Sequence, residues 1–185
     1  MSLNNMVQCS RGHQHYGKNG AAGIILYRYR DDGQVEMLLS QRSANVDHPN
    51  TWCTIGGLVN DGEQTFQAAI REMQEETGYL IRQSNIALTG AAQDNHGGWT
   101  YTTYFATPNH NVKIPDAFKL QTSEITQVRW ITRKELGHYP LHPSFLDHTV
   151  RLMNTMLQRD YDPATGAFCP TVNFTSILPK RWTQE

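Results

Sequence analysis

The sequence predicts an α/β domain in which helices cover a mixed sheet. Two observations predict this class: short segments with strand character recur along most of the chain, and two longer segments have helical periodicity. Strands that alternate with helices form layered structures of this kind. With 185 residues, of which 38% are hydrophobic and 18% are charged, we expect one domain with a proper core.

The composition excludes several classes of function. A net charge of −1 provides no basic stripe that could neutralise the phosphates of a nucleic-acid polymer. The longest apolar run, Ala21–Leu26, is too short to span a bilayer, and no signal peptide opens the chain. Cys9, Cys53 and Cys169 are an odd, scattered set, which suits a reduced cytoplasm. We therefore expect a cytoplasmic protein without a membrane or nucleic-acid polymer as partner.

The predicted domain covers residues 20–160, between a polar N-terminal segment, 1–19, and a tail, 161–185, that packs on the domain or on a second subunit. A homodimer is thus left open. The N-terminal segment holds a C-x3-H-x-H cluster made of Cys9, His13 and His15. A zinc site would need a fourth ligand, and the sequence offers none at a recognised spacing. The alternative is a polar segment that folds against the domain without metal.

The strands are predicted from runs with β-type composition that end at turn residues. In chain order they are expected over Ala21–Arg30, Val35–Arg42, Asn85–Gln93, Trp99–Thr107 and Val128–Ile131. The turn Asp31-Asp32-Gly33 joins the first two as a hairpin. After the last strand, helical spacing of apolar residues predicts a helix over Phe145–Arg159.

The other helix lies in the stretch Gly57–Tyr79, around which the rest of the chain is organised. After a glycine pair and a turn at Asn60-Asp61-Gly62, four apolar residues recur at i, i+3, i+4 and i+7 and form one stripe, Phe66, Ala69, Ile70 and Met73. Asp61 is expected to be the N-cap, and Gly78 is expected to end the helix in a left-handed conformation.

Three carboxylates, Glu72, Glu75 and Glu76, lie on a different face of this helix from the apolar stripe. Like charges at these spacings destabilise a helix by a few tenths of a kcal/mol per pair. Mg²⁺ would remove the repulsion, because it prefers oxygen ligands and commonly bridges carboxylates and substrate phosphates. A solvated helix face is the alternative for these three residues taken alone.

The full stretch resembles the signature of the Nudix hydrolase family. That signature reads Gly, five residues, Glu, seven residues, then Arg-Glu-apolar-any-Glu-Glu-any-Gly-apolar, and it is matched here by Gly57, Glu63, Arg71, Glu72, Met73, Glu75, Glu76, Gly78 and Tyr79. A chance match to its seven fixed positions is on the order of one in 10⁸ per window. Tyr79 replaces the usual aliphatic residue, and Ile55 replaces the proline that usually precedes the glycine pair. The resemblance implies an α/β/α sandwich with a mixed sheet.

The resemblance also implies Mg²⁺-dependent hydrolysis of the pyrophosphate linkage in a nucleoside diphosphate joined to another moiety, with Mn²⁺ as a substitute for Mg²⁺. By matched position, Glu75 and Glu76 are the principal metal ligands and the Gly56 carbonyl assists. Glu72 is a further ligand or the base that deprotonates water. Arg71 orients the carboxylates through a charge-assisted pair with an acid at the helix start such as Glu63.

Residues outside the signature complete the expected site. Glu124, which precedes an apolar-x-Trp strand, resembles a late acidic residue of the family that can join the metal site. Arg42 is expected to contact a phosphate, or else to be a surface arginine at a strand end. Trp52 and Tyr101 are candidates to cover the ligand or stack on its base, with core packing as the alternative for each.

The signature does not specify the substrate. ADP-ribose, dinucleoside polyphosphates, oxidised deoxynucleotides and nucleotide sugars all stay open, and specificity is expected to lie in the loops Asn45–Thr51, Asp94–Trp99 and Asn109–Leu120. Two other classes of function are also considered. One is a regulatory domain that binds a nucleotide without cleaving it, although such domains usually have an eroded signature. The other is an isopentenyl-diphosphate isomerase that uses Cys53 and a glutamate, and the complete signature favours hydrolysis over both.

Overall fold

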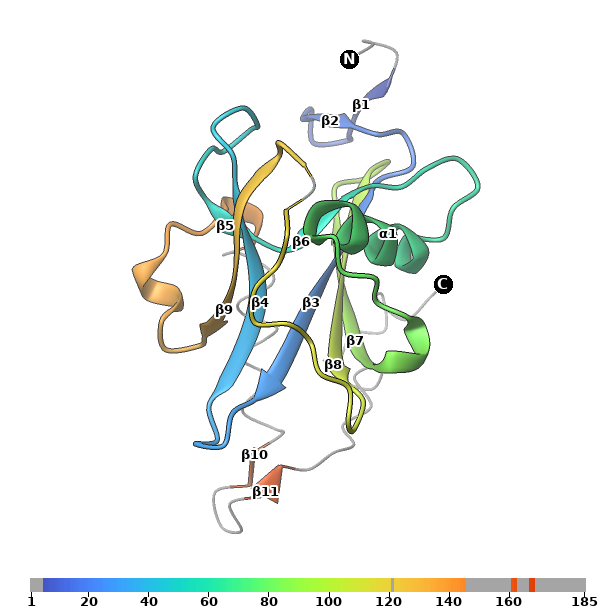
Figure 1. The fold of residues 1–185 in the computed structure, drawn as a ribbon. Helices are drawn as coiled ribbons and strands as arrows, with labels where there is room; N and C mark the ends of the chain where they lie inside the picture. Colours follow the sequence, from blue (N-terminus) through green and yellow to red (C-terminus); the bar gives the residue numbers. More distant parts are fainter. Residues whose placement is uncertain (1–4, 121, 146–160, 163–166, 169–185) are drawn as a thin grey trace.

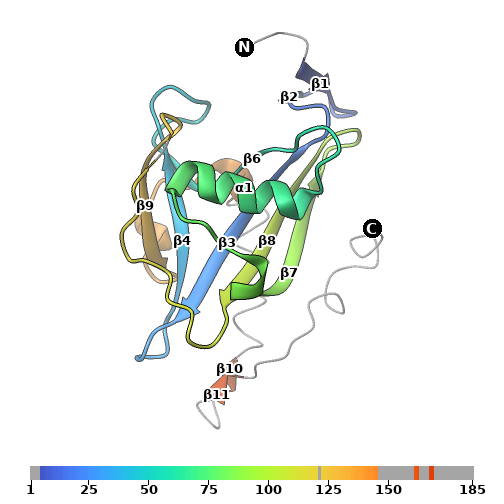
Figure 2. The ribbon, with the colours of Figure 1, turned by 45° about the vertical axis from the view of Figure 1, so that its right-hand side comes forward.

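In the computed structural model, which describes residues 5–120, 122–145, 161–162 and 167–168, one α-helix lies across one face of a mixed sheet (Figures 1 and 2). The main sheet has seven strands: β3 Ala21–Tyr29, β4 Val35–Arg42, β5 Trp52–Cys53, β6 Ile55–Leu58, β7 Ile86–Asn95, β8 Thr100–Pro108 and β9 Ile125–Thr132. Their order is β5-β4-β3-β8-β7, with β6 also on β3 and β9 also on β4. Since β3 and β8 are parallel and the other pairs are antiparallel, the predicted mixed sheet is confirmed.

Smaller elements complete the described part of the chain. They are the strands β1 Met6–Gln8 and β2 Gln14–Tyr16, which pair as a hairpin, the 3-10 helices η2 Gln83–Asn85 and η3 Leu136–His138, and the paired strands β10 Tyr161–Asp162 and β11 Ala167–Phe168. The helix predicted over Phe145–Arg159 lies outside the described residues, except for Phe145. None of the helices that the structure describes is long and apolar enough to cross a membrane.

The helix α1, Thr65–Thr77, begins later than Asp61 would require as its N-cap. Gln64 occupies the N-cap position and makes no side-chain cap hydrogen bond. The Asp61 carboxylate instead accepts hydrogen bonds from Asn19 Nδ2 at 2.7 Å and from Lys18 Nζ at 2.9 Å. The N-cap prediction was therefore wrong, because this carboxylate ties the turn to the segment before β3. The predicted left-handed Gly78 is confirmed, with φ at 69°.

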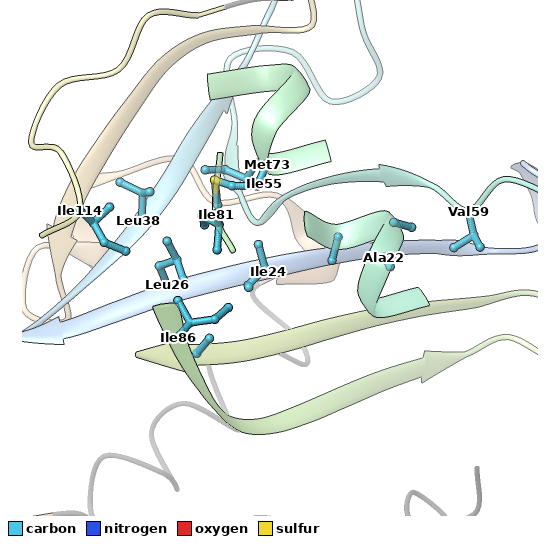
Figure 3. Packing of buried hydrophobic residues seen from close by; sticks show 13 residues of the cluster. Ala22, Ile24, Leu26, Leu38, Ile55, Val59, Met73, Ile81, Ile86 and Ile114 are labelled. Atoms are coloured by element: carbon cyan, nitrogen blue, oxygen red, sulfur yellow. The ribbon is translucent and has the colours of Figure 1, made fainter. Parts of the chain in front are cut away.

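The apolar stripe of α1 packs on the sheet as predicted (Figure 3). Ala69 and Met73 are fully buried, and Phe66 and Ile70 pack against the same cluster. The facing side chains come mainly from the sheet, with Ala22, Ile24 and Leu26 on β3, Leu38 on β4 and Ile55 on β6. Buried apolar side chains stabilise a fold by roughly 25 cal/mol per Å² of surface removed from water, so this contact fixes α1 against β3 and β6.

The strands β3 and β4 diverge beneath the end of the helix. They pair over Tyr27–Tyr29 and Val35–Met37, but β3 then pairs with β6 and β8 while β4 pairs with β5 and β9. The last turn of α1 points toward β4 and β9 (Figure 2). The divergence leaves room for polar side chains between sheet and helix, and the candidate site lies there.

Candidate functional site

The glycine pair lets α1 approach β6 closely. A Cβ atom at Gly57 would lie 2.5 Å from the carboxyl carbon of Glu72 and 2.6 Å from each of its oxygens. A Cβ atom at Gly56 would lie 2.4 Å from the backbone oxygen of Ala22 on the neighbouring strand. A side chain at Gly56 would therefore displace the backbone of β3, whereas one at Gly57 would push the Glu72 carboxylate aside.

Arg71 organises the acids at the start and middle of α1. Its Nε and Nη2 donate to the two oxygens of Glu63 at 2.8 and 3.0 Å, which is the predicted charge-assisted pair. Its Nη1 donates to Glu72 at 2.8 Å and to Glu75 at 2.9 Å, and its Nη2 also donates to the Leu58 carbonyl at 2.7 Å. The bond to Arg71 holds the pKa of Glu63 below its usual value. Arg71 thus fixes the helix to the β6 end and orients two of the predicted site carboxylates.

The Glu76 carboxylate is buried, and one of its oxygens lacks a hydrogen-bond partner. Only 5% of the residue is exposed, and its Oε2 atom has no hydrogen-bond partner. The Gly56 backbone N–H lowers the pKa of this carboxylate, but only in part offsets the effects that raise it. Burial, then the charges of Glu72 and Glu124, raise the pKa of Glu76 to about 8. Because an unpaired buried charge is costly, this group is either protonated or balanced by a cation.

Glu72 and Glu75 differ in their surroundings. Burial raises the pKa of Glu72 even though Arg71 favours its charged form, and Glu75 and Glu124 add repulsion. The Glu75 side chain is 56% exposed and so extends toward solvent beside Arg71. The three carboxylates therefore run from a buried position at Glu76 to an open one at Glu75.

A polar pocket lies between the last turn of α1 and the diverging strands. Its lining residues are Ser40, Arg42, Val46, Cys53, Thr54, Gly56, Glu76, Glu124 and Ile125. The structure thus brings together four residues predicted from the sequence, Arg42, Gly56, Glu76 and Glu124. Arg42 Nε donates to the Asp47 carbonyl at 2.6 Å, and its positive charge lowers the pKa of Glu76. Burial raises the pKa of the Cys53 thiol in the same pocket.

Ser40 and Thr54 were not predicted to line this pocket. Both are buried polar residues, at 1% and 7% exposure. Their signal in the sequence is weak, because a small hydroxyl residue in a strand is common in any sheet.

The donor set of this region fits a hard divalent cation. Glu76 provides an orphaned buried oxygen, and Glu72, Glu75 and Glu124 add carboxylate oxygens, which Mg²⁺ and Mn²⁺ prefer. These carboxylates do not converge as closely as two other groups in the described residues, whose ligating atoms lie within 4.8 Å of one another. Arg71 accounts for this difference, because its hydrogen bonds draw the Glu72 and Glu75 carboxylates toward its guanidinium.

The two predicted aromatic residues differ in exposure, since Trp52 is buried and Tyr101 is partly exposed. Trp52 is 3% exposed and packs in the cluster on the face of the sheet opposite α1, with its ring 5.1 Å from that of Tyr139. Its buried ring offers no exposed face to a ligand, which corrects the expectation that it covers one. The Tyr101 hydroxyl lies against the backbone at Gly23 and Gly56, and burial raises its pKa. Tyr101 therefore packs against the backbone of β3 and β6 at these two glycines.

The fold and this site define an α/β protein with an acid-rich helix beside a double glycine. Residues 18–153 match the model of the NUDIX domain, and the chain belongs to the Nudix family. The family and the fold predicted from the sequence are therefore confirmed.

Individual relatives support the same assignment. The chain is 36% identical over 130 residues to a nucleoside triphosphate pyrophosphatase/Nudix hydrolase fusion protein of Bifidobacterium longum, covering 68% of this chain and 26% of that protein. It is 31% identical over 152 residues to a Mycobacterium tuberculosis protein provisionally named 8-oxo-dGTP diphosphatase 3, covering 79% of this chain and 67% of that protein. The chain thus spans about a quarter of the first relative and two thirds of the second.

Among solved structures, a Nudix hydrolase of M. smegmatis, RenU, superposes with a TM-score of 0.69 at 26% identity, covering 83% of this chain and 94% of that one. The hydrolase names of these relatives support the predicted enzyme class, a pyrophosphohydrolase.

Proposed function

We propose that this protein hydrolyses the pyrophosphate linkage of a nucleoside diphosphate joined to another moiety, with Mg²⁺ as its cofactor and Mn²⁺ as a substitute. The observation that carries the proposal is the buried Glu76 carboxylate, which has an unpartnered oxygen, on a residue that lines a pocket with Gly56, Arg42 and Glu124. A site that buries acids in this way is suited to a cation and to the anionic ligand that the cation would bind.

In this proposal Glu75 and Glu76 are the principal metal ligands, and Glu72, Glu124 and the Gly56 carbonyl assist. Bound divalent cations polarise phosphoryl oxygens and lower the pKa of a coordinated water. Glu72 acts as a further ligand or as the base that accepts a proton from water. Either role needs the ionised carboxylate, which the Arg71 guanidinium favours from 2.8 Å away.

Arg71 is a positioning residue in this proposal, and Arg42 is the substrate-binding residue. The guanidinium of Arg42 lines the pocket next to Glu76, where it can donate hydrogen bonds to a phosphate oxygen. Trp52 is assigned no contact with the substrate, because it is buried in the core. Tyr101, which is partly exposed, is kept as a second substrate-binding residue.

The relative named for 8-oxo-dGTP makes an oxidised deoxynucleoside triphosphate the first substrate to test. ADP-ribose, dinucleoside polyphosphates and nucleotide sugars complete the panel. Untagged protein would be incubated with each compound in Mg²⁺, in Mn²⁺ and in a chelator, and the phosphate-containing products would be separated and quantified. The proposal predicts cleavage of at least one compound that stops in the chelator.

The same assay separates the alternatives. Tight binding of a nucleotide without cleavage in Mg²⁺ would identify a regulatory domain instead. Conversion of an isoprenoid diphosphate without phosphate release, abolished by alkylation of Cys53, would identify an isomerase. Several expectations from the sequence stay predictions. They are a cytoplasmic location, a homodimer, the absence of a nucleic-acid polymer or membrane as partner, and the division into residues 1–19, 20–160 and 161–185.

A further inference from the structure

A second cluster of metal-ligating side chains lies where the β1–β2 hairpin meets the loop between β7 and β8. Its members are Cys9, His13, His15 and His96, and one ligating atom from each lies within 4.8 Å of the others. In a tetrahedral zinc site with Zn–S near 2.3 Å and Zn–N near 2.0 Å, ligand atoms are roughly 3.3 to 3.6 Å apart. Small side-chain movements would therefore bring the four atoms to this geometry.

Two atoms of this N-terminal Cys/His cluster are buried without a partner. Among the described residues, His15 Nε2 and His96 Nδ1 are buried side-chain nitrogens that lack a hydrogen bond. The other nitrogen of His96, Nε2, lies 2.9 Å from Asp94 Oδ2. If Nε2–H donates to this carboxylate, Nδ1 carries a lone pair, which is the arrangement found around metal-ligating histidines.

The fold holds the cluster together from two segments that are far apart in sequence. The β1–β2 hairpin places Val7 opposite His15, and the Cys9 N–H donates to the His13 carbonyl at 2.9 Å. Figures 1 and 2 both show this hairpin above the tip of the β7–β8 hairpin, which carries His96. This explains why no fourth ligand appears beside the C-x3-H-x-H pattern in the sequence.

Contacts around the cluster are specific. The Ser10 N–H donates to the Gly97 carbonyl at 2.8 Å, and its Oγ donates to the His96 carbonyl at 2.9 Å. A Cβ atom at Gly97 would lie 2.0 Å from Ser10 Oγ, and its φ of 73° favours glycine as well. The His15 ring stacks on Trp99, with 4.1 Å between centroids and 11° between planes. The imidazoles are thus oriented by their neighbours.

We propose that Cys9, His13, His15 and His96 bind one Zn²⁺ ion in a closed structural site that fastens the N-terminal hairpin to the β7–β8 loop. One thiolate and three imidazoles suit Zn²⁺ and not the Mg²⁺ of the proposed catalytic site, because these ligands are softer than carboxylates. Four protein ligands leave no position for a substrate, so the role is structural. The hairpin has two strands of three residues, which are too short to be stable alone in water.

The other close group, Asp47, His48 and His142, is a weaker candidate. It offers three ligands, of which Asp47 and His48 are exposed. The Asp47 carboxylate already pairs with His48 Nδ1 at 2.7 Å. This group therefore provides a matched control for nonspecific binding of zinc to histidines.

The test is the metal content of untagged, full-length protein, purified without chelator and measured by mass spectrometry. We expect about one zinc ion per chain in the wild type. Cys9→Ser and His96→Asn should each lose most of this zinc, whereas His48→Asn and Cys53→Ser should retain it. A wild type that takes up no zinc when Zn²⁺ is supplied, or a Cys9→Ser variant that retains its zinc, would overturn the proposal.

A second measurement guards against variants that simply fail to fold. Cobalt-loaded wild type should show the strong visible absorption of tetrahedral Co²⁺ and a thiolate-to-metal band in the near ultraviolet. The thiolate band should disappear in Cys9→Ser while its circular dichroism and its Mg²⁺-dependent activity stay close to wild type. A band that persists in Cys9→Ser and disappears in Cys53→Ser would also contradict the proposal.

Discussion

The acid-rich end of α1 and the N-terminal Cys/His cluster differ in how the chain assembles them. The acids on α1 come from one continuous stretch, so their spacing is visible in the sequence, and Arg71 and the glycine pair position them locally. The Cys/His cluster depends on His96, which is 81 residues after His15 and is brought near only by the sheet. The two regions also differ in chemistry, since one offers hard oxygen ligands and the other offers nitrogen and sulfur.

The largest expected effect tests whether the acids on α1 carry the chemistry. Glu75→Gln and Glu76→Gln should each lower kcat at least about a hundredfold, because each removes a charged ligand for the cation. The measurement is steady-state hydrolysis at saturating Mg²⁺ on the substrate that the panel identifies. Gln67→Ala, an exposed change on the same helix, is the matched control and should leave kcat unchanged. Wild-type rates in both glutamine variants would show that the acids on α1 do not carry the chemistry.

The next effect concerns the local support of the acid site. Arg71→Ala should lower the free energy of unfolding by about 2 kcal/mol, because Glu63 and Glu72 would lose their charge-assisted partner while staying largely buried. Urea denaturation monitored by circular dichroism measures this change. Lys18→Ala removes a single exposed ion pair with Asp61 and should change stability little. Equal effects of both changes would show that Arg71 has no special structural role.

A smaller effect is expected from the close packing of the glycine pair. Gly57→Ala should destabilise the protein by about 1 to 2 kcal/mol and lower kcat, since its methyl group would push the Glu72 carboxylate out of place. Gly137→Ala is the control, because a Cβ atom there would meet no heavy atom within 4 Å. A Gly57→Ala variant with wild-type stability and activity would show that the Glu72 position is not fixed by β6.

Per pH unit, the smallest effect is a pH dependence of stability in protein stripped of divalent cations. The pKa of Glu76 is about 8 in the fold and lies near the usual 4.5 in the unfolded chain, so the folded state binds more protons between these values. Stability should therefore fall as pH rises from 4.5 to 8, with a slope of at most about 1.4 kcal/mol per pH unit. Urea titrations at several pH values measure the slope. Glu76→Gln should flatten it, and an unchanged slope in that variant would exclude Glu76 as its source.

The sequence predicted the parts of the fold that depend on local pattern. The strands near Ala21–Arg30 and Val35–Arg42, the buried stripe of α1 and the left-handed Gly78 follow from periodicity and glycine geometry. The N-cap at Asp61 was wrong because a contact with Lys18 and Asn19 outweighs the local preference. Long-range contacts of this kind leave no periodic signal in the sequence.

The candidate site shows the same division. The Glu63–Arg71 pair and the acids of α1 could be predicted from spacing on one helix. The divergence of β3 and β4 determines two further features. Trp52 packs on the face of the sheet opposite α1, and Ser40 and Thr54 line the pocket. Such positions are set by tertiary packing, which single residue types do not encode.

The most direct test of the central claim is a crystal structure of the protein grown with Mn²⁺, with diffraction data collected at the manganese absorption edge. The account predicts an anomalous peak among the carboxylates of Glu72, Glu75 and Glu76, close to the Gly56 backbone. A map with no peak there, in which these side chains point apart into solvent, would contradict it.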